Sequence, residues 1–264
     1  MVNPVTKSEL LTRVAQTPEE RQLLARAADQ IDHAQRGSPA CTPFLSTAQQ
    51  EAVGRLISAA GGPRHLWAGG FPDAERKVCA FLPDWQEEGD WEPPFTALRC
   101  RWQSGDKLTH RDFLGSILGQ GLDREKVGDI LVGNGVCDIL VFRELAPYLL
   151  QNLTGAGRAR LRTEEIPLAD ITPPEKQVKV IRDTVSSLRL DAVLSTGFSI
   201  ARGKAAGLIT AGRVELNHRP CTKADRTVNE GDVMTCRGLG KCVLKEVNGL
   251  SKKGRTMIEM ERYL

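Results

Sequence analysis

Aromatic residues are scarce in this 264-residue chain, and it contains no long apolar run. Tryptophan, tyrosine and phenylalanine make up 5% of the residues, and no run approaches the roughly 18 apolar residues that a membrane span needs. The start, MVNPVTKSELLTRV, has no apolar stretch of the signal-peptide type. With 41% hydrophobic and 26% charged residues, the composition is that of a folded globular protein. We expect a cytoplasmic protein of two or three domains without a membrane span.

Patterns that bind a metal, a nucleotide or a catalytic cofactor are also missing. The seven cysteines are scattered without a C-x-x-C pair, and the four histidines lie far apart. The glycines at 155 and 157 do not have dinucleotide-binding spacing, and the run H-R-D at 110–112 lacks the other parts of a kinase catalytic loop. We predict reduced thiols, no metal and no cofactor, and we expect that the protein is not an enzyme.

Positive charge is concentrated at the C-terminal end, although the whole chain has a net charge of only +3. Residues 1–170 carry 19 Lys and Arg against 23 Asp and Glu, a net charge of −4, whereas residues 171–264 carry 17 against 10, a net charge of +7. A basic segment of this kind favours an acidic polymer as partner. On charge alone, a basic domain without such a partner stays an alternative.

Residues 1–90 have the pattern of a small α/β domain. Thr17 and the P-E-E that follows it form a capping box with proline at the first helical position, which predicts a helix over residues 18–35. Ser46 or Thr47 begins a second helix that ends before the glycines at 61 and 62. Short β-type runs follow at residues 65–68 and 78–82.

Residues 91–170 have the element order β-α-β-β-α-β. A helix begins after Thr109, and a second helix is predicted over 144–153. The order is the split unit of ferredoxin-like folds, a plait that RNA-recognition domains share with enzymes and regulatory modules. We therefore expect an α+β chain with an RNA-recognition-like plait as its second domain. Its strands are predicted over 95–102, 127–132, 136–142 and 159–166.

The prolines at 173 and 174 mark a linker, and we expect residues 171–187 to comprise this linker and a connecting helix over 175–187. The third domain, residues 188–264, begins with a short helix that Gly197 stops. Ser199 is expected to cap a second helix that ends at Ala211, and the remainder is predicted to be β-rich.

The helix predicted after Ser199 has an apolar side that can pack in a hydrophobic core and an opposite side of small residues. At 100° per residue, Arg202 and Lys204 flank the apolar side, and Gly203 and Gly207 lie opposite it. A glycine inside a helix costs roughly 1 kcal/mol relative to alanine. Close approach of a phosphodiester backbone would explain both glycines, and tolerance on a solvated face is the alternative. The apolar side comprises Ala201, Ala205, Leu208 and Ile209.

Several further polar residues have two readings. Asn217 either caps the turn at 217–220 or donates to a sugar, and Asp191 is expected to orient an arginine. Arginines alternate along the strand predicted over 159–166, which indicates either a second basic surface or a solvated edge. The run E-R-K at 75–77 is an RNA contact or a solvated strand start. The candidate RNA-binding residues are Arg189, Ser199, Arg202, Gly203, Lys204, Arg213, Asn217, Arg219, Arg237, Lys241, His110, Arg111, Arg158 and Arg160.

The C-terminal pattern resembles a known RNA-binding module. Residues 189–217 read R-L-D-x2-L-x6-A-R-x-K-A-x2-L-I-x2-G-R-V-x-L-N, and V-x-E-G-D follows at 228–232. This run is similar to the small module named after ribosomal small-subunit protein S-four. Members usually carry Ser-Arg-Ser-Lys where this chain has A-R-G-K at 201–204, so both basic positions are kept and two hydroxyl groups are missing.

Two further segments resemble signatures of the bacterial YlmH family. They are G-G-F-P-D-A-E-R at 69–76, and H-R-D-F-L-G at 110–115 continuing through R-E-K-V-G-D-I at 124–130. The family includes photosystem-related proteins of plants and cyanobacteria. The resemblance implies a three-domain protein that binds large ribosomal subunits blocked by peptidyl-tRNA and supports tailing of the stalled chain.

From residues and resemblance together we expect a non-enzymatic protein that binds rRNA and tRNA on the large ribosomal subunit, with no DNA specificity. An RNA-modifying enzyme, of the pseudouridine synthase or rRNA methyltransferase type, is the alternative, because this module is often appended to such enzymes. A third possibility is an adaptor whose basic surface binds an acidic protein.

Overall fold

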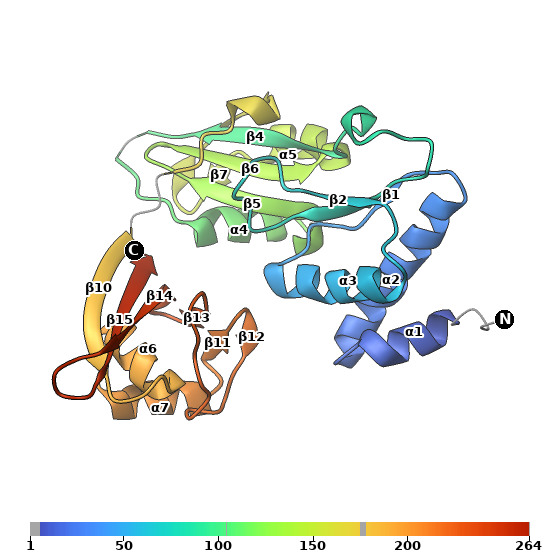
Figure 1. Cartoon of the computed structure of the whole chain (residues 1–264). Coiled ribbons are helices and arrows are strands. Elements are labelled where there is room, and N and C mark those ends of the chain that lie inside the picture. The colour runs from blue at the N-terminus through green and yellow to red at the C-terminus, as the bar shows by residue number, and fades with distance from the viewer. Residues whose placement is uncertain (1–5, 104, 175–177, 264) are drawn as a thin grey trace. The chain divides into compact units, whose positions relative to one another are not determined.

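The structure is a computed structural model that describes residues 6–103, 105–174 and 178–263 (Figure 1). The chain forms two compact units, residues 1–174 and 175–264. All seven cysteines are free thiols. Among the described residues, no helix has the length and apolar character that crossing a membrane requires.

The first unit begins with three helices that pack against a small antiparallel sheet of order β1-β3-β2. The Thr17 side chain accepts the N–H of Glu20, and Ser46 forms a capping box with Gln49, so two of the helices begin at the predicted residues. The first helix was not predicted from the sequence. The elements are α1 (Lys7–Val14), α2 (Pro18–Gln35), β1 (Ala40–Cys41), α3 (Thr47–Ala59), β2 (His65–Ala68) and β3 (Val78–Phe81).

A second, four-stranded sheet has the order β5-β6-β4-β9, and every neighbouring pair is antiparallel. Two helices bury Phe113 and Leu149 against one face of this sheet, where they meet Leu98 and Ile139. The observed chain order along these elements is β-α-β-β-α-β, and the fold is mixed α and β. The elements are β4 (Phe95–Arg101), α4 (His110–Leu118), β5 (Val127–Val132), β6 (Val136–Phe142), α5 (Ala146–Asn152) and β9 (Arg162–Ile166).

The opposite face of this sheet is covered by the N-terminal part of the unit. The Phe44 ring lies 5.1 Å from the Phe95 ring and 5.4 Å from the Phe142 ring, centroid to centroid. These rings share a buried cluster with Val78 and Leu140. RNA-recognition domains stack bases on aromatic side chains of an open sheet. Here those positions are buried, so this face offers no such platform.

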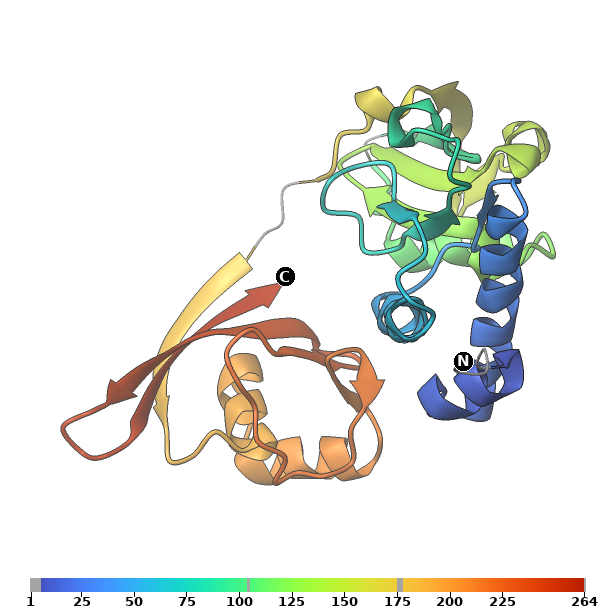
Figure 2. The ribbon, with the colours of Figure 1, turned by 45° about the vertical axis from the view of Figure 1, so that its right-hand side comes forward.

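The second unit is a six-stranded antiparallel sheet of order β10-β15-β14-β13-β11-β12 with two helices packed on one side (Figure 2). Leu190, Val193 and Ile209 of the helices are buried against Leu244 and Met260 of the sheet. The elements are β10 (Val178–Val185), α6 (Leu190–Phe198), α7 (Arg202–Thr210), β11 (Val214–Leu216), β12 (Arg219–Pro220), β13 (Val233–Cys236), β14 (Gly240–Leu250) and β15 (Thr256–Tyr263).

The helix predicted over 175–187 is wrong for the part that the structure describes. Residues 178–185 form β10, which pairs along its whole length with β15. Val178, Val180 and Val185 favour an extended backbone, and pairing with a strand distant in sequence outweighs local helix signals. Residues 175–177 lie outside the described residues.

Two smaller expectations also need correction. The strand predicted over 159–166 is divided at Leu161: β8 (Ala159–Arg160) pairs with β7 (Gly155–Ala156), and only β9 joins the large sheet. Helix α6 continues through Gly197 to Phe198, and a Cβ atom at Gly197 would lie 2.7 Å from the Met260 Cε atom. That glycine is therefore a site of close packing and does not stop the helix.

We expect Gly128→Ala to destabilise the first unit. A Cβ atom at this position would lie 2.8 Å from both Leu140 Cβ and Phe44 Cε1, so the core must shift, at a cost of about 1–3 kcal/mol in the free energy of unfolding. Denaturant unfolding followed by tryptophan fluorescence measures this, because all four tryptophans lie before residue 103. Gly54→Ala, inside α3 with open space around it, is the control and should stabilise the unit. Equal midpoints for Gly128→Ala and the wild type would contradict the described packing.

Candidate nucleic-acid interface

One buried carboxylate holds two arginines at the start of the helix pair in the second unit. Arg189 donates to Asp191 from Nε at 3.3 Å and from Nη2 at 3.2 Å, and Arg202 Nη2 donates to the two carboxylate oxygens at 3.0 and 3.2 Å. The Asp191 side chain is 8% exposed, whereas those of Arg189 and Arg202 are 43% and 47% exposed. The expectation that Asp191 orients an arginine is therefore confirmed, and it orients two.

The charges of this cluster stabilise the ionised forms of Asp191 and Arg189. Burial on its own raises the pKa of Asp191, but hydrogen bonds and charges from Arg189 and Arg202 outweigh it, and the pKa falls below its ordinary value. The hydrogen bond to Asp191 raises the pKa of Arg189. Asp191 neutralises one of the two positive charges, so these three side chains keep a net charge of +1, and Asp225 is a further carboxylate whose charge acts on Arg189.

Helix α7 presents small residues and Lys204 to solvent. Gly203 and Gly207 are exposed, and a Cβ atom on either would meet nothing within 4 Å. Ser199 does not cap this helix: it ends α6 in the left-handed conformation with φ 53°, and Ala201 occupies the N-cap position of α7. Ala201 is exposed, so the predicted apolar side is wrong at this residue.

The remaining candidates of the second unit lie in the strands and turns after α7. Arg213 Nη2 donates to the carbonyl of Arg237 at 3.1 Å, which brings these two basic residues together. Asn217 holds a turn: its Nδ2 donates to Asp232 at 2.8 Å and its Oδ1 accepts the N–H of Val233 at 2.9 Å. Two candidates lie elsewhere in this sheet, Arg219 in β12 and Lys241 in β14, where it stands over the Tyr263 ring.

The structure also brings together the candidates of the first unit. Gly157, in the turn between β7 and β8, packs so closely on α4 that a Cβ atom there would lie 3.3 Å from Asp112 Oδ1. This contact places the hairpin of Arg158 and Arg160 beside the first turn of α4, where His110 and Arg111 lie. Because the strand is divided, these arginines do not continue onto a face shared with β9.

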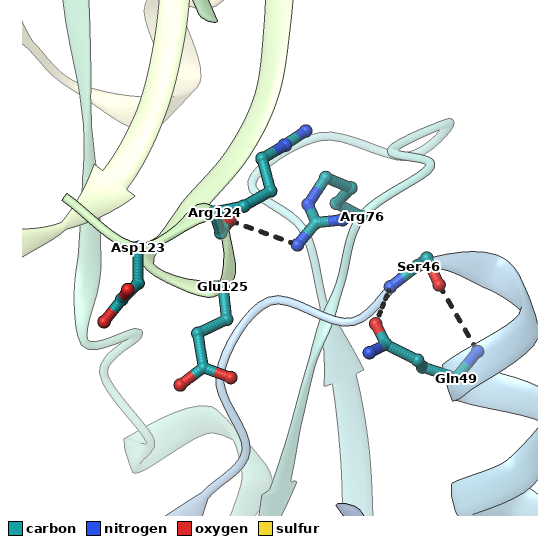
Figure 3. Close-up of a pocket in the computed structure, with 6 residues that line it drawn as sticks. All are labelled: Ser46, Gln49, Arg76, Asp123, Arg124 and Glu125. Atoms are coloured by element: carbon teal, nitrogen blue, oxygen red, sulfur yellow. Dashed lines mark hydrogen bonds between the residues drawn. The ribbon is translucent and has the colours of Figure 1, made fainter. Parts of the chain in front are cut away.

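Two arginines line a pocket of the first unit (Figure 3): Arg76, from the E-R-K run for which RNA contact was one of two explanations, and Arg124, which was not among the candidates. Arg76 donates from Nη2 to the carbonyl of Phe44 at 2.6 Å and to that of Arg124 at 3.3 Å. Arg124 Nη1 donates to the carbonyls of Val127 and Gly128. The signal for them was present, since both arginines belong to the signature segments. Among the described residues no group of His, Cys, Asp and Glu could hold a metal ion.

We expect Asp191→Asn to loosen the helix pair. The amide cannot balance two guanidinium groups, so exchange of the backbone amides of α6 and α7 with deuterium should become about tenfold faster, as for the loss of one charged hydrogen bond. Because folding lowers the pKa of Asp191, its contribution is complete above its ordinary value of 3.8 and is lost as the pH falls through the lowered pKa. Asp183→Asn, on the exposed strand β10, is the control of equal charge. Unchanged exchange in Asp191→Asn would show that the carboxylate does not hold the helices.

Comparison with known proteins identifies two family domains. Residues 103–170 match the family model described as "Putative RNA-binding domain in YlmH", and residues 188–234 match the S4 domain. In solved structures, a chain of the cell division protein YlmH from Streptococcus pneumoniae is 24% identical with a TM-score of 0.49, over 59% of this chain and 96% of that chain. This structural likeness is too distant to carry an argument.

A curated relative is similar over most of its length. The ribosome-associated protein quality control protein P2 of Bacillus subtilis is 34% identical in an alignment of 229 positions, and the match covers 84% of this chain and 86% of the relative. Identity at this level over most of both chains, together with the two domain matches, makes this chain a member of the YlmH family.

Proposed function

We propose that this protein is a non-enzymatic factor that binds rRNA and tRNA on the large ribosomal subunit and acts in ribosome-associated quality control in the cytoplasm. Both matched family models describe RNA-binding domains, and the Bacillus subtilis relative is named as a ribosome-associated quality control protein. The net charge of +7 over residues 171–264 supports a polyanionic partner for the second unit.

The observation that carries this proposal is the arginine pair held by Asp191. A guanidinium group that is already fixed loses less side-chain entropy when it binds a phosphate, and its planar donors match two phosphate oxygens. Arg189 and Arg202 are fixed in this way, and their side chains remain about half exposed. In this proposal Lys204 and Arg213 contact neighbouring phosphates, while Asn217 holds the turn between β11 and β12. The other members of the candidate set are Ser199, Gly203, Arg219, Arg237 and Lys241 in the second unit and His110, Arg111, Arg158 and Arg160 in the first.

We also propose that the four-stranded sheet of the first unit is a ferredoxin-like plait and that a domain boundary lies near residue 90. The sheet order β5-β6-β4-β9 with antiparallel neighbours supports the plait. The Phe44 cluster buries the sheet face across that boundary. RNA contacts of this unit are therefore expected at the α4 and hairpin surface, where phosphate contacts dominate over base stacking.

Sedimentation of a cell lysate on a sucrose gradient tests the proposed function. We expect the wild type to run with free large subunits, and Arg202→Ala/Lys204→Ala to run at the top of the gradient. Each lost phosphate contact should also reduce the salt slope of RNA binding by about one. Lys252→Ala/Lys253→Ala, in the exposed turn between β14 and β15, is the control with equal charge loss. A wild type that stays at the top while still binding isolated RNA would contradict the ribosomal role and favour a modification activity.

Gly203→Ala separates the two explanations of the glycines in α7. Nothing within 4 Å opposes a Cβ atom there, so the substitution should stabilise the second unit by roughly 0.5–1 kcal/mol. If an RNA backbone approaches this face, the same methyl group should weaken RNA binding several-fold. Hydrogen exchange and filter binding measure the two effects, with Gly54→Ala as the control. Stabilisation without any loss of RNA binding would show that the face is merely solvated.

A further inference from the structure

Segments that are far apart in the sequence meet at one place in the first unit. The segment at 69–76 ends with Arg76, whose Nε donates to the carbonyl of Val127 at 3.0 Å in the segment at 124–130. The N–H groups of Glu75 and Arg76 donate to the Asp129 carboxylate at 2.7 and 3.0 Å. Phe113, from the segment at 110–115, shares a buried core cluster with Val127. All of the signature segments thus contribute to one cluster.

This cluster opens into a pocket of about 650 Å³ (Figure 3). Neither carboxylate at the rim pairs with Arg76. The Glu125 Oε1 atom lies 3.4 Å from Arg26 Nη1, and the Asp123 side chain points away from Arg76 in Figure 3. The lining residues are Ser46, Gln49, Arg76, Asp123, Arg124 and Glu125.

Part of the Arg124 guanidinium group makes no hydrogen bond to the described residues. Its Nη1 atom donates to the carbonyls of Val127 and Gly128, whereas among the described residues its Nε and Nη2 atoms have no hydrogen-bond partner. These two atoms form one edge of the planar guanidinium group, and that edge matches two oxygens of a phosphate. The backbone contacts hold the group from one side and leave this edge for a ligand.

Arg76 and Arg124 are neighbouring positive charges, and Asp129, Asp123 and Glu125 place negative charges around them. Neither Arg76 nor Arg124 forms an ion pair with a carboxylate among the described residues, and Asp129 is occupied by backbone N–H groups. Burial, together with the charge of Arg124, lowers the pKa of Arg76 to about 10. Desolvation of the charged imidazole and the charge of Arg124 also lower the pKa of His110. An anion between the guanidinium groups would relieve this repulsion.

We propose that Arg124, supported by Arg76, binds a phosphate group of the RNA backbone in this pocket. The inference rests on the proposed RNA-binding function and extends it to a second site in the first unit. A pocket of this size takes more than a single phosphate ion, and Arg124 lies within the matched RNA-binding domain that also holds His110 and Arg111. Arg76 is a positioning residue, because most of its donors hold backbone carbonyls.

The test measures binding of the full chain to purified large-subunit rRNA at several salt concentrations. Arg124→Gln should lower the slope of log affinity against log salt by about one, as for one lost phosphate contact, and Arg124→Lys should keep the slope. Arg36→Gln is the matched control: it is exposed and lies ten residues beyond Arg26, about 15 Å along the same helix. An unchanged slope in a folded Arg124→Gln protein overturns the proposal. If Arg202→Ala/Lys204→Ala still lowers the salt slope of rRNA binding in that case, the proposed function stands and only the Arg124 site is lost.

A second variant leaves Arg124 and its hydrogen bonds unchanged and alters the neighbouring carboxylates. Asp123→Asn/Glu125→Gln removes two negative charges from the rim and should tighten rRNA binding several-fold. Glu87→Gln/Asp90→Asn, on exposed residues elsewhere in this unit, should change binding much less. Equal effects of the two double variants would show only a general effect of net charge and overturn the proposal.

Inorganic phosphate distinguishes the source of the anion. We expect the Nε–H NMR signal of Arg124 to shift with added rRNA and to shift only weakly, without saturation, with millimolar phosphate. Saturation by phosphate together with an unchanged salt slope for rRNA would identify the free ion as ligand and overturn the RNA assignment.

Discussion

The proposed RNA interface depends on one carboxylate, Asp191, that is buried beneath two arginines. A buried carboxylate is costly unless it is paired, and the two guanidinium groups satisfy it while remaining about half exposed. The pairing fixes the start of α6 relative to the start of α7, and the three side chains together keep a net charge of +1. In the proposed function, stability and RNA recognition therefore use the same three side chains, Asp191, Arg189 and Arg202.

The first unit differs from the second in its charge, because residues 1–170 have a net charge of −4. Both faces of its four-stranded sheet are buried. One face packs against the helices α4 and α5 and the other packs in the cluster of Phe44, Val78 and Phe95, so the sheet has no open aromatic face. Basic groups gather instead at the ends of elements, at the start of α4, on the β7–β8 hairpin and around Arg124. Phosphate contacts can use such places without sequence readout.

Local signals in the sequence were sufficient for most helices and strands and for the basic helix α7. The capping signature at Thr17 predicted the bounds of α2, Ser46 was one of two caps expected for α3, and the same signature at Thr6 was present for α1. The valines of β10 favour an extended backbone, but its pairing with β15, near the end of the chain, is not visible in the local sequence. The pocket was missed for the same reason: Arg76 and Arg124 are distant in sequence, and only the fold joins them.

Cross-linking of RNA to the full chain by ultraviolet light in cells, with the modified peptides mapped by mass spectrometry, tests the account most directly. We predict cross-links from large-subunit rRNA on α6, α7 and the β11–β12 turn, and in the first unit on the start of α4 and the β7–β8 hairpin. Cross-links confined to other surfaces, or their complete absence in cells where the protein is present, would contradict the central claim that the Asp191 arginine pair forms an RNA-binding surface.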